Sequence, residues 1–235
     1  MNQLIIGFMR IYNLIFPAVC YSCKKRITVQ RDCLCEECKK NLQRKPEKLA
    51  GEDAIGNRYF DVAYSIYHYN HTVRELIHDF KYKEIKIIGD FFAQKMIDYL
   101  NDELSDLLCV DGLVSVPMFS VKQRERSFNQ AEYILKKIVK EYHLRDYSKS
   151  VYKSNPTVSQ ALQSFQSRID NPRNSFKVKN ADVLKNKTLL IIDDVFTTGA
   201  TANELAKTLK QNGVKKIYIL TIASGDMEIK EKYAS

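Results

Sequence analysis

The chain lacks tryptophan, low-complexity segments, runs of five or more basic residues, and any apolar stretch long enough to span a bilayer. Its most apolar window, residues 1–16, is interrupted by Arg10. No basic region precedes this window and no small-residue cleavage site follows it, although a signal peptide has both. We therefore expect a cytoplasmic protein that is not an integral membrane protein. Apolar residues recur at helical spacing in the window, which predicts an amphipathic helix packed on the protein body rather than on a membrane surface.

Aromatic bulk comes instead from 14 tyrosines and 11 phenylalanines, and 45% of the 235 residues are hydrophobic. This is enough for one sizeable core and a small accessory module. Basic residues outnumber acidic ones by 37 to 28, which gives a formal net charge of +9. Such an excess favours polyanionic partners. Because the lysines are spread along the whole chain, solubility alone is the alternative explanation.

Four of the six cysteines form two C-x-x-C pairs, Cys20 with Cys23 and Cys35 with Cys38. Two such pairs supply four thiolates, which suit a tetrahedral structural zinc without an open coordination position. A disulfide framework is disfavoured because no export signal is recognisable. A redox C-x-x-C motif is also disfavoured, since it would not occur in duplicate. The sequence therefore predicts a zinc module near the N-terminus.

The other two cysteines have different expected roles. Cys33 lies two residues before Cys35 and could compete with it for the fourth zinc position, so the ligand set stays open at this point. Cys109 lies within the apolar segment 107–110 and is expected to be a small buried apolar residue.

A polar, basic connector at residues 39–56 separates the zinc module from the rest of the chain. We expect an N-terminal helix and zinc module at 1–50, a main domain at 55–225 and a polar tail at 226–235. Strands are predicted at 60–69, 111–118, 148–153, 176–178, 188–195 and 215–222, and helices at 72–83, 87–100, 131–142 and 201–212. From residue 113 onward strands alternate with helices, and the strands near Leu190 and Leu220 are continuously apolar. These features predict an α/β fold with a doubly wound parallel sheet, covered by helices on both faces.

The segment 187–201 carries the most informative pattern in the chain. Residues 189–192 are typical of a buried strand, so Asp193 and Asp194 are expected at its end, with side chains pointing to opposite sides. A hydroxyl-rich turn follows, and then a helix whose N-terminal amides suit a phosphate. The turn consists of Thr197, Thr198, Gly199, Ala200 and Thr201. Together they suit a ribose 5-phosphate, with the carboxylates facing the ribose 2′,3′-diol or a Mg²⁺.

Other phosphate motifs do not fit this segment. The Gly-Lys-Ser/Thr element of a Walker P-loop is missing, and one glycine stands where a dinucleotide fingerprint has three. An acid-rich strand end followed by a capped helix is the simplest alternative, but the density of hydroxyls and acids favours ligand binding.

Three further cations, Lys122, Arg124 and Arg126, lie between a predicted strand end and a predicted helix start. In an α/β sheet this position is again the ligand edge. A solvated loop is the alternative, but Ser127 and Asn129 suit capping of the helix and a fixed loop shape.

Two other segments of the main domain could contribute to a binding site at this edge of the sheet. The helix at 72–83 ends with Lys81 and Lys83, which suit the negative end of a helix dipole and could equally reach an anion. The polar, glutamine-rich segment 155–171 has little periodicity and is interpreted as a mobile flap over an active site.

The segment 192–201 resembles the phosphoribosyl-pyrophosphate loop of the type I phosphoribosyltransferases. The resemblance implies that Asp193 and Asp194 hold the ribose hydroxyls and that the turn 197–201 holds the 5-phosphate. The rest of the chain resembles the ComF family of late competence proteins, which is phosphoribosyltransferase-like and serves uptake of transforming DNA. The motifs that carry this resemblance are the four cysteines, Phe80-Lys-Tyr82, Val116-Pro117, Arg126-Ser-Phe-Asn-Gln130, Thr157 with Gln160, Arg168 with Asn171, and Phe176.

The resemblance implies a phosphoribosyltransferase-type sheet that binds phosphoribosyl pyrophosphate with Mg²⁺, and pyrophosphate neutralised by Lys122, Arg124 and Arg126. It also implies handling of single-stranded DNA, with the zinc module docking a partner such as a helicase-like ATPase. The sequence departs from the family where Ser127 replaces a glycine. The alternative function is an active phosphoribosyltransferase on a nucleobase or amine acceptor, unrelated to DNA uptake. No segment is typical of a nucleobase pocket, so neither the acceptor nor a catalytic residue is predicted.

Overall fold

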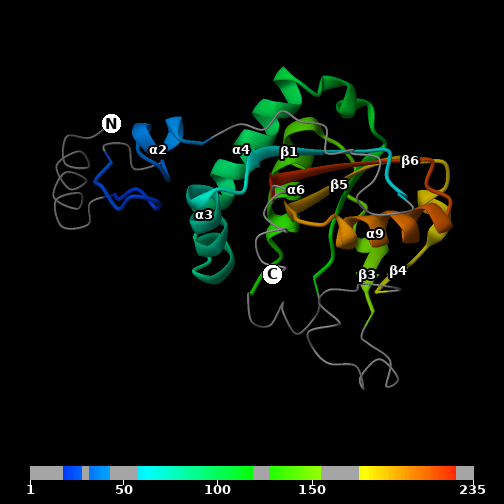
Figure 1. The fold of residues 1–235 in the computed structure, drawn as a ribbon. Helices are drawn as coiled ribbons and strands as arrows, with labels where there is room; N and C mark the ends of the chain where they lie inside the picture. The colour runs from blue at the N-terminus through cyan, green and yellow to red at the C-terminus, as the bar shows by residue number, and fades with distance from the viewer. Residues whose placement is uncertain (1–17, 28–31, 43–57, 119–126, 155–174, 226–235) are drawn as a thin grey trace, which may run out of the picture.

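The computed structural model of the protein describes residues 18–27, 32–42, 58–118, 127–154 and 175–225 (Figure 1). Four expected segments lie wholly or mostly outside these residues: the N-terminal helix at 1–16, the connector at 39–56, the glutamine-rich segment at 155–171 and the tail at 226–235. The domain boundaries predicted within them stay predictions.

Among the described residues, four parallel strands form the main sheet, in the order β1-β6-β5-β2. β5 is therefore central and pairs with a neighbour on each side. Its residues are apolar and buried from Leu189 to Ile192, as a strand covered on both faces requires. The strands are β1 (Val62–His68), β2 (Gly112–Ser115), β5 (Thr188–Phe196) and β6 (Lys216–Ser224).

Helices cover both faces of this sheet. Leu189 and Ile191 of β5 belong to the apolar cluster that includes α9, whereas Leu190 and Ile192 belong to the cluster that includes α3, α4 and α6. Figure 1 shows α9 on one side of the sheet and α4 with α6 on the other. The predicted doubly wound parallel sheet is confirmed. The helices are α3 (His71–Tyr82), α4 (Lys86–Asp102), α6 (Gln130–Tyr142) and α9 (Ala200–Gln211), and the short ones are α2 (Glu36–Lys40), η1 (Ser105–Cys109), η2 (Ser148–Ser150) and η3 (Ala181–Leu184).

Local side chains explain where the long helices begin and end. Asn70 caps α3, and Asn129 caps α6 by accepting a hydrogen bond from the backbone N–H of Ala131 at 3.0 Å. The Asn129 amide also donates to the Val116 carbonyl at 2.9 Å, which ties the start of α6 to the end of β2. Beyond α9, Gly213 takes a left-handed conformation with φ 89° and stops the helix.

The strands predicted at 148–153 and 176–178 form a separate antiparallel pair, β3 (Val151–Lys153) with β4 (Phe176–Val178). Residues 148–150 are a 3₁₀ turn rather than a strand. The reason is a tertiary contact: the Ser148 hydroxyl accepts a hydrogen bond from the backbone N–H of Ser115 at 2.9 Å, at the edge of β2 that does not pair with β5.

The prediction that Cys109 is buried is wrong, because its side chain is exposed. It ends the 3₁₀ helix η1, in which side chains three residues apart lie on one face. Leu107 and Val110 occupy that inward face, and Cys109 between them points outward.

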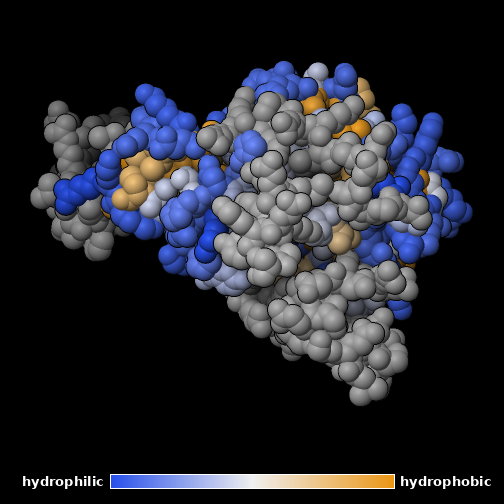
Figure 2. Space-filling view, in the orientation of Figure 1, coloured by the Kyte–Doolittle hydropathy of each residue, from blue (hydrophilic) through white to orange (hydrophobic). Residues whose placement is uncertain are grey.

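The small N-terminal module packs beside α3 and α4 (Figure 1). Leu34 is fully buried in the same apolar cluster as these helices. The Ser22 hydroxyl donates to the Thr72 hydroxyl at 3.4 Å, and the Lys24 ammonium lies 3.9 Å from the Asp79 carboxylate. Figure 2 shows a mainly hydrophilic described surface, with apolar residues visible on this module. None of the described helices combines the length and apolar character needed to cross a membrane.

Candidate functional site

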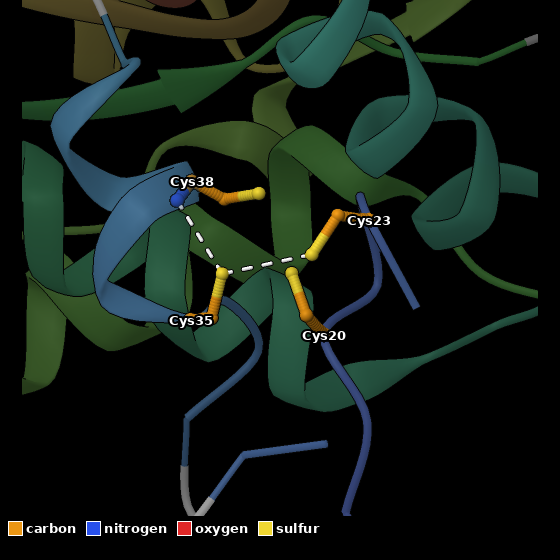
Figure 3. Close-up of side chains that lie close together, drawn as sticks. All are labelled: Cys20, Cys23, Cys35 and Cys38. Atoms are coloured by element: carbon orange, nitrogen blue, oxygen red, sulfur yellow. Dashed lines mark hydrogen bonds between the residues drawn. The ribbon is translucent and has the colours of Figure 1, made fainter. Parts of the chain in front are cut away.

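The fold brings the two C-x-x-C pairs together (Figure 3). The Sγ atoms of Cys20, Cys23, Cys35 and Cys38 all lie within 4.8 Å of one another, and those of Cys23 and Cys35 are 3.6 Å apart. In a tetrahedral site with Zn–S bonds of about 2.3 Å, the sulfurs are about 3.8 Å apart. The four side chains therefore fit a single zinc ion.

Two tight turns hold these sulfurs in place. In the first, the backbone N–H of Lys24 donates to the Cys20 carbonyl at 2.9 Å, and Lys24 takes a left-handed conformation with φ 62°. In the second, Cys35 caps α2, and its Sγ accepts a hydrogen bond from the backbone N–H of Cys38 at 3.4 Å. Such a bond favours the thiolate, because the positive end of the N–H dipole faces the sulfur.

The four thiols conflict electrostatically when all are ionised. Burial opposes ionisation of Cys20, but hydrogen bonds from the backbone N–H groups of Cys35, Cys23 and Ser22 outweigh it and lower its pKa to about 6. Burial raises the pKa of Cys38 to about 12, and the Cys23 and Cys35 sulfurs add to this shift. A bound Zn²⁺ would remove the conflict, because its charge lets all four thiols lose their protons.

Cys33 lies outside this cluster. Its side chain is 1% exposed and packs into the apolar core beside Leu34. Burial raises the pKa of the Cys33 thiol to about 12, so it stays protonated. The geometry therefore favours Cys35 over Cys33 as the fourth metal ligand.

The predicted acid pair lies where β5 extends beyond β2. β2 ends at Ser115, opposite Ile192, whereas β5 continues beside β6 to Phe196. Alternation along the strand puts Asp193 in the row of side chains that packs toward α9, and Asp194 in the row that packs toward α3, α4 and α6. The two carboxylates thus face different helices.

Asp193 is held against the backbone of its neighbour. Its Oδ1 accepts a hydrogen bond from the backbone N–H of Asp194 at 2.8 Å. Burial raises the pKa of Asp193 to about 7, and the negative charge of Asp194 contributes further, while Lys81 and Lys153 act in the opposite direction. Asp193 therefore keeps its proton at pH values where an ordinary carboxyl group is ionised.

Asp194 has a cationic partner. The Nζ of Lys81, in the last turn of α3, lies 2.6 Å from its Oδ2. The other lysine at this helix end, Lys83, instead pairs with Asp79 of the same helix at 2.8 Å. The sequence left open what these lysines reach, because the Lys81 partner lies on a strand far along the chain. The one available signal was a lysine ending a helix near the predicted ligand edge.

The hydroxyl-rich turn connects β5 to α9. Gly199 is buried and left-handed, with φ 71°, a conformation that side chains disfavour. The Thr198 hydroxyl accepts a hydrogen bond from the backbone N–H of Ala200 at 3.3 Å, while Thr197 is exposed and Thr201 half-buried. α9 has no side-chain cap, and its first N–H groups have no acceptor within the helix. They form a suitable site for an anion.

The three predicted cations, Lys122, Arg124 and Arg126, lie outside the described residues. The residue after them, Ser127, adopts φ 54°, the left-handed conformation that glycine accommodates more easily. Asn129 then fixes the chain to the end of β2, the strand next to β5. Residues 127–129, which follow the cations in the chain, thus lie at the end of β2, beside the strand that carries the acid pair.

Comparison with known protein families agrees with this geometry. The family described as phosphoribosyl transferase domain matches residues 91–235, which include the acid pair and the turn that follows it. The chain belongs to this family.

Individual curated relatives show which kind of phosphoribosyl transferase domain protein the chain resembles. The chain is 24% identical to competence protein F of Haemophilus influenzae over 224 residues, which span 87% of this chain and 96% of that protein. It is 27% identical over 146 residues to the DNA utilization protein YhgH of Escherichia coli K12, spanning 61% and 63% of the two chains. It is 26% identical over 155 residues to competence protein ComFC of Streptococcus pneumoniae, spanning 65% and 64%. The resemblance to the ComF family is confirmed.

The four-cysteine cluster predicts about one zinc per chain in the purified protein, measured by mass spectrometry of the metal after dialysis. Cys38→Ala should lose this zinc, because three thiolates hold the ion more weakly than four. Cys33→Ala removes another buried thiol, which lies outside the cluster, and is the matched control, which should keep its zinc. Zinc lost from Cys33→Ala and retained by Cys38→Ala would contradict the ligand set.

The raised pKa of Asp193 predicts a pH-dependent stability. The folded protein holds this proton up to a pH of about 7 and the unfolded chain releases it near 3.8, so stability falls as the pH rises between these values. Asp193→Asn stays neutral and can still accept the Asp194 N–H. The free energy of unfolding of Asp193→Asn, minus that of the wild type, should therefore be greater at pH 8 than at pH 4, by roughly 1–3 kcal/mol.

Denaturant unfolding at several pH values measures this difference. Asp182→Asn is the control, because Asp182 is exposed and the Lys185 ammonium lowers its pKa. It should show no such growth with pH. A gain for Asp193→Asn that is the same at pH 4 and pH 8 would mean that ionising Asp193 costs the fold nothing.

Proposed function

We propose that the protein binds phosphoribosyl pyrophosphate with Mg²⁺ at the carboxyl end of β5 and acts in the uptake or processing of transforming DNA. The observation that carries the proposal is the pairing, within a phosphoribosyl transferase domain, of two adjacent carboxylates with the uncapped N-terminus of α9. Carboxylates accept hydrogen bonds from a sugar diol, and helix N-termini bind phosphate.

Each part of the site has a proposed role. Asp193 and Asp194 accept hydrogen bonds from the two ribose hydroxyls. The 5-phosphate binds the backbone N–H groups at the start of α9, where Gly199 lets the backbone approach closely. Hydroxyl groups complete this phosphate site, and they come from Thr197, Thr198 and Thr201, with Ala200 contributing its backbone.

The pyrophosphate of the donor binds across the sheet edge, at Lys122, Arg124 and Arg126. Arginine side chains suit this role, because their planar forks bind phosphate oxygens in bidentate fashion. Mg²⁺ bound with the donor, beside the carboxylates of Asp193 and Asp194, would reduce the negative charge of the donor. Zinc in the four-cysteine module would be structural, since four protein thiolates leave no open coordination position.

An active transferase is the second candidate function. The acid pair supports it, because two carboxylates that hold the ribose would position the donor for transfer. In that reaction the bond between ribose C1 and the pyrophosphate oxygen breaks, and pyrophosphate leaves with the electron pair. A nucleobase or amine nitrogen forms the new bond to C1 and loses its proton. The protein would contribute positioning of the donor and stabilisation of the leaving group's charge.

The relatives' names support the DNA role: competence protein F, competence protein ComFC and DNA utilization protein. The net charge of +9 is compatible with a polyanionic partner. On α3 Tyr82 is 59% exposed, and the His78 ring lies 4.9 Å from its ring, centre to centre. Exposed rings beside cations suit stacking of single-stranded bases. The zinc module would dock a further partner, such as a helicase-like ATPase.

Calorimetry with phosphoribosyl pyrophosphate and Mg²⁺ tests the donor site. The wild type should bind, and Asp193→Asn combined with Asp194→Asn should bind at least about tenfold more weakly, because the charged acceptors for the ribose hydroxyls are lost. Asp182→Asn with Asp146→Asn removes two exposed carboxylates elsewhere and should bind like the wild type. No binding by the wild type, or binding unchanged by the double substitution, would overturn the assignment.

Fluorescence anisotropy with a labelled oligothymidine tests the DNA role. Affinity should fall steeply as salt rises, because phosphate binding releases counterions. Tyr82→Ala should weaken binding roughly fivefold or more, as expected for one lost stacking contact. Val183→Ala, which shortens an exposed apolar side chain on η3 and removes no ring, is the control and should leave binding unchanged. Undetectable or salt-independent binding would contradict the DNA role.

A further inference from the structure

The last turn of α3 contacts the acid pair and the residues that follow the predicted cations. Lys81 pairs with Asp194 of β5 at 2.6 Å. The preceding residue, Phe80, packs its ring against Phe128 at a centroid distance of 5.4 Å. Phe128 belongs to the segment that leads from the proposed pyrophosphate-binding cations into α6. One helix end thus connects the two parts of the chain that would hold the donor.

Lys81 has little freedom to leave this position. Phe80 is completely buried and packs so closely on α4 that a Cβ at Gly89 would lie 2.5 Å from its ring. The buried face of α3 continues through Leu76 and Ile77. The backbone from which the Lys81 side chain extends is therefore fixed by core packing.

The ion pair itself is shielded from water. The side chains of Lys81 and Asp194 are only 18% and 19% exposed. Charges in such surroundings interact more strongly than charges on an open surface, because less water screens them. Lys83, in contrast, is 57% exposed and pairs with Asp79.

The acid pair creates an electrostatic problem for its proposed ligand. A phosphoribosyl donor carries a 5-phosphate and a pyrophosphate, and the Asp194 carboxylate repels both, as does Asp193 once it is ionised. Lys81 forms an ion pair with Asp194, and Lys153 also acts electrostatically on Asp193. Lys81 bonds Oδ2 of Asp194, so Oδ1 can still accept a hydrogen bond from a ribose hydroxyl.

We propose that Lys81 is a specificity-determining residue, the built-in counter-ion that lets the acid pair accept a pyrophosphorylated ribose. The inference rests on the proposed donor site. It assigns Lys81 to the charge balance of that site rather than to the capping of α3. The contribution of Lys81 to ligand affinity should therefore increase with the negative charge of the ligand.

The test compares two ligands of different charge by calorimetry: phosphoribosyl pyrophosphate with Mg²⁺, and ribose 5-phosphate. Lys81→Met keeps the length and apolar packing of the side chain and removes the charge. It should weaken binding of phosphoribosyl pyrophosphate by about tenfold or more, and binding of ribose 5-phosphate by a clearly smaller factor. Lys81→Arg keeps the charge and should stay within about threefold of the wild type for both ligands.

Lys86→Met is the matched control. It removes one positive charge from an exposed position at the start of α4 and should leave both affinities unchanged. Equal weakening of both ligands in Lys81→Met, or no weakening, would overturn the proposal while leaving the donor site intact. Failure of the wild type to bind phosphoribosyl pyrophosphate would instead remove the proposed function on which it rests.

Discussion

The structure depends on the unequal lengths of the strands beside β5. Up to Ile192 this strand is paired on both sides and covered on both faces, so only apolar side chains fit. Beyond that point β2 no longer accompanies it, and β6 alone carries it to Phe196. Polar side chains therefore become acceptable at the position where the strand is still rigid. The acid pair occupies this short half-paired stretch, so its carboxylates are held by sheet hydrogen bonds rather than by a loop.

Sequence patterns predicted this stretch well because the information is local. The apolar run, the two acids, the single glycine and the following helix are contiguous, and each follows from burial or backbone conformation of a few residues. The C-x-x-C pairs were likewise readable, since short spacing alone brings each pair of sulfurs together. Choosing Cys35 over Cys33 was not possible at that level. Both lie close to Cys38 in the chain, and only the turn before α2 decides which sulfur faces the cluster.

Three other features were not predicted, because the residues that surround them in the sequence do not determine them. Lys81 could be assigned to the end of α3, but its partner is set by how the helix packs on the sheet. The 3₁₀ turn at 148–150 has strand-like neighbours, yet the open edge of β2 recruits the Ser148 hydroxyl. Cys109 has an apolar local sequence, but the tight period of η1 turns it outward. For Lys81 and Ser148 a contact with a distant part of the chain decided the outcome, whereas for Cys109 the period of a short 3₁₀ helix did.

The two proposed binding sites solve the same electrostatic problem in different ways. Each gathers groups of like charge: four thiols in the N-terminal module and two carboxylates on β5. Four sulfurs packed within 4.8 Å leave no room for a protein cation, so a metal ion is the counter-charge that fits. The carboxylates point to opposite faces of a strand, and that separation admits a lysine on one face while Asp193 keeps its proton on the other. α3 lies between these sites, since Thr72 contacts the metal module and Lys81 contacts the acid pair. A substitution that shifts α3 would therefore disturb both sites. A substitution confined to the cysteine turns, or to the turn after β5, would disturb only the site to which that turn belongs.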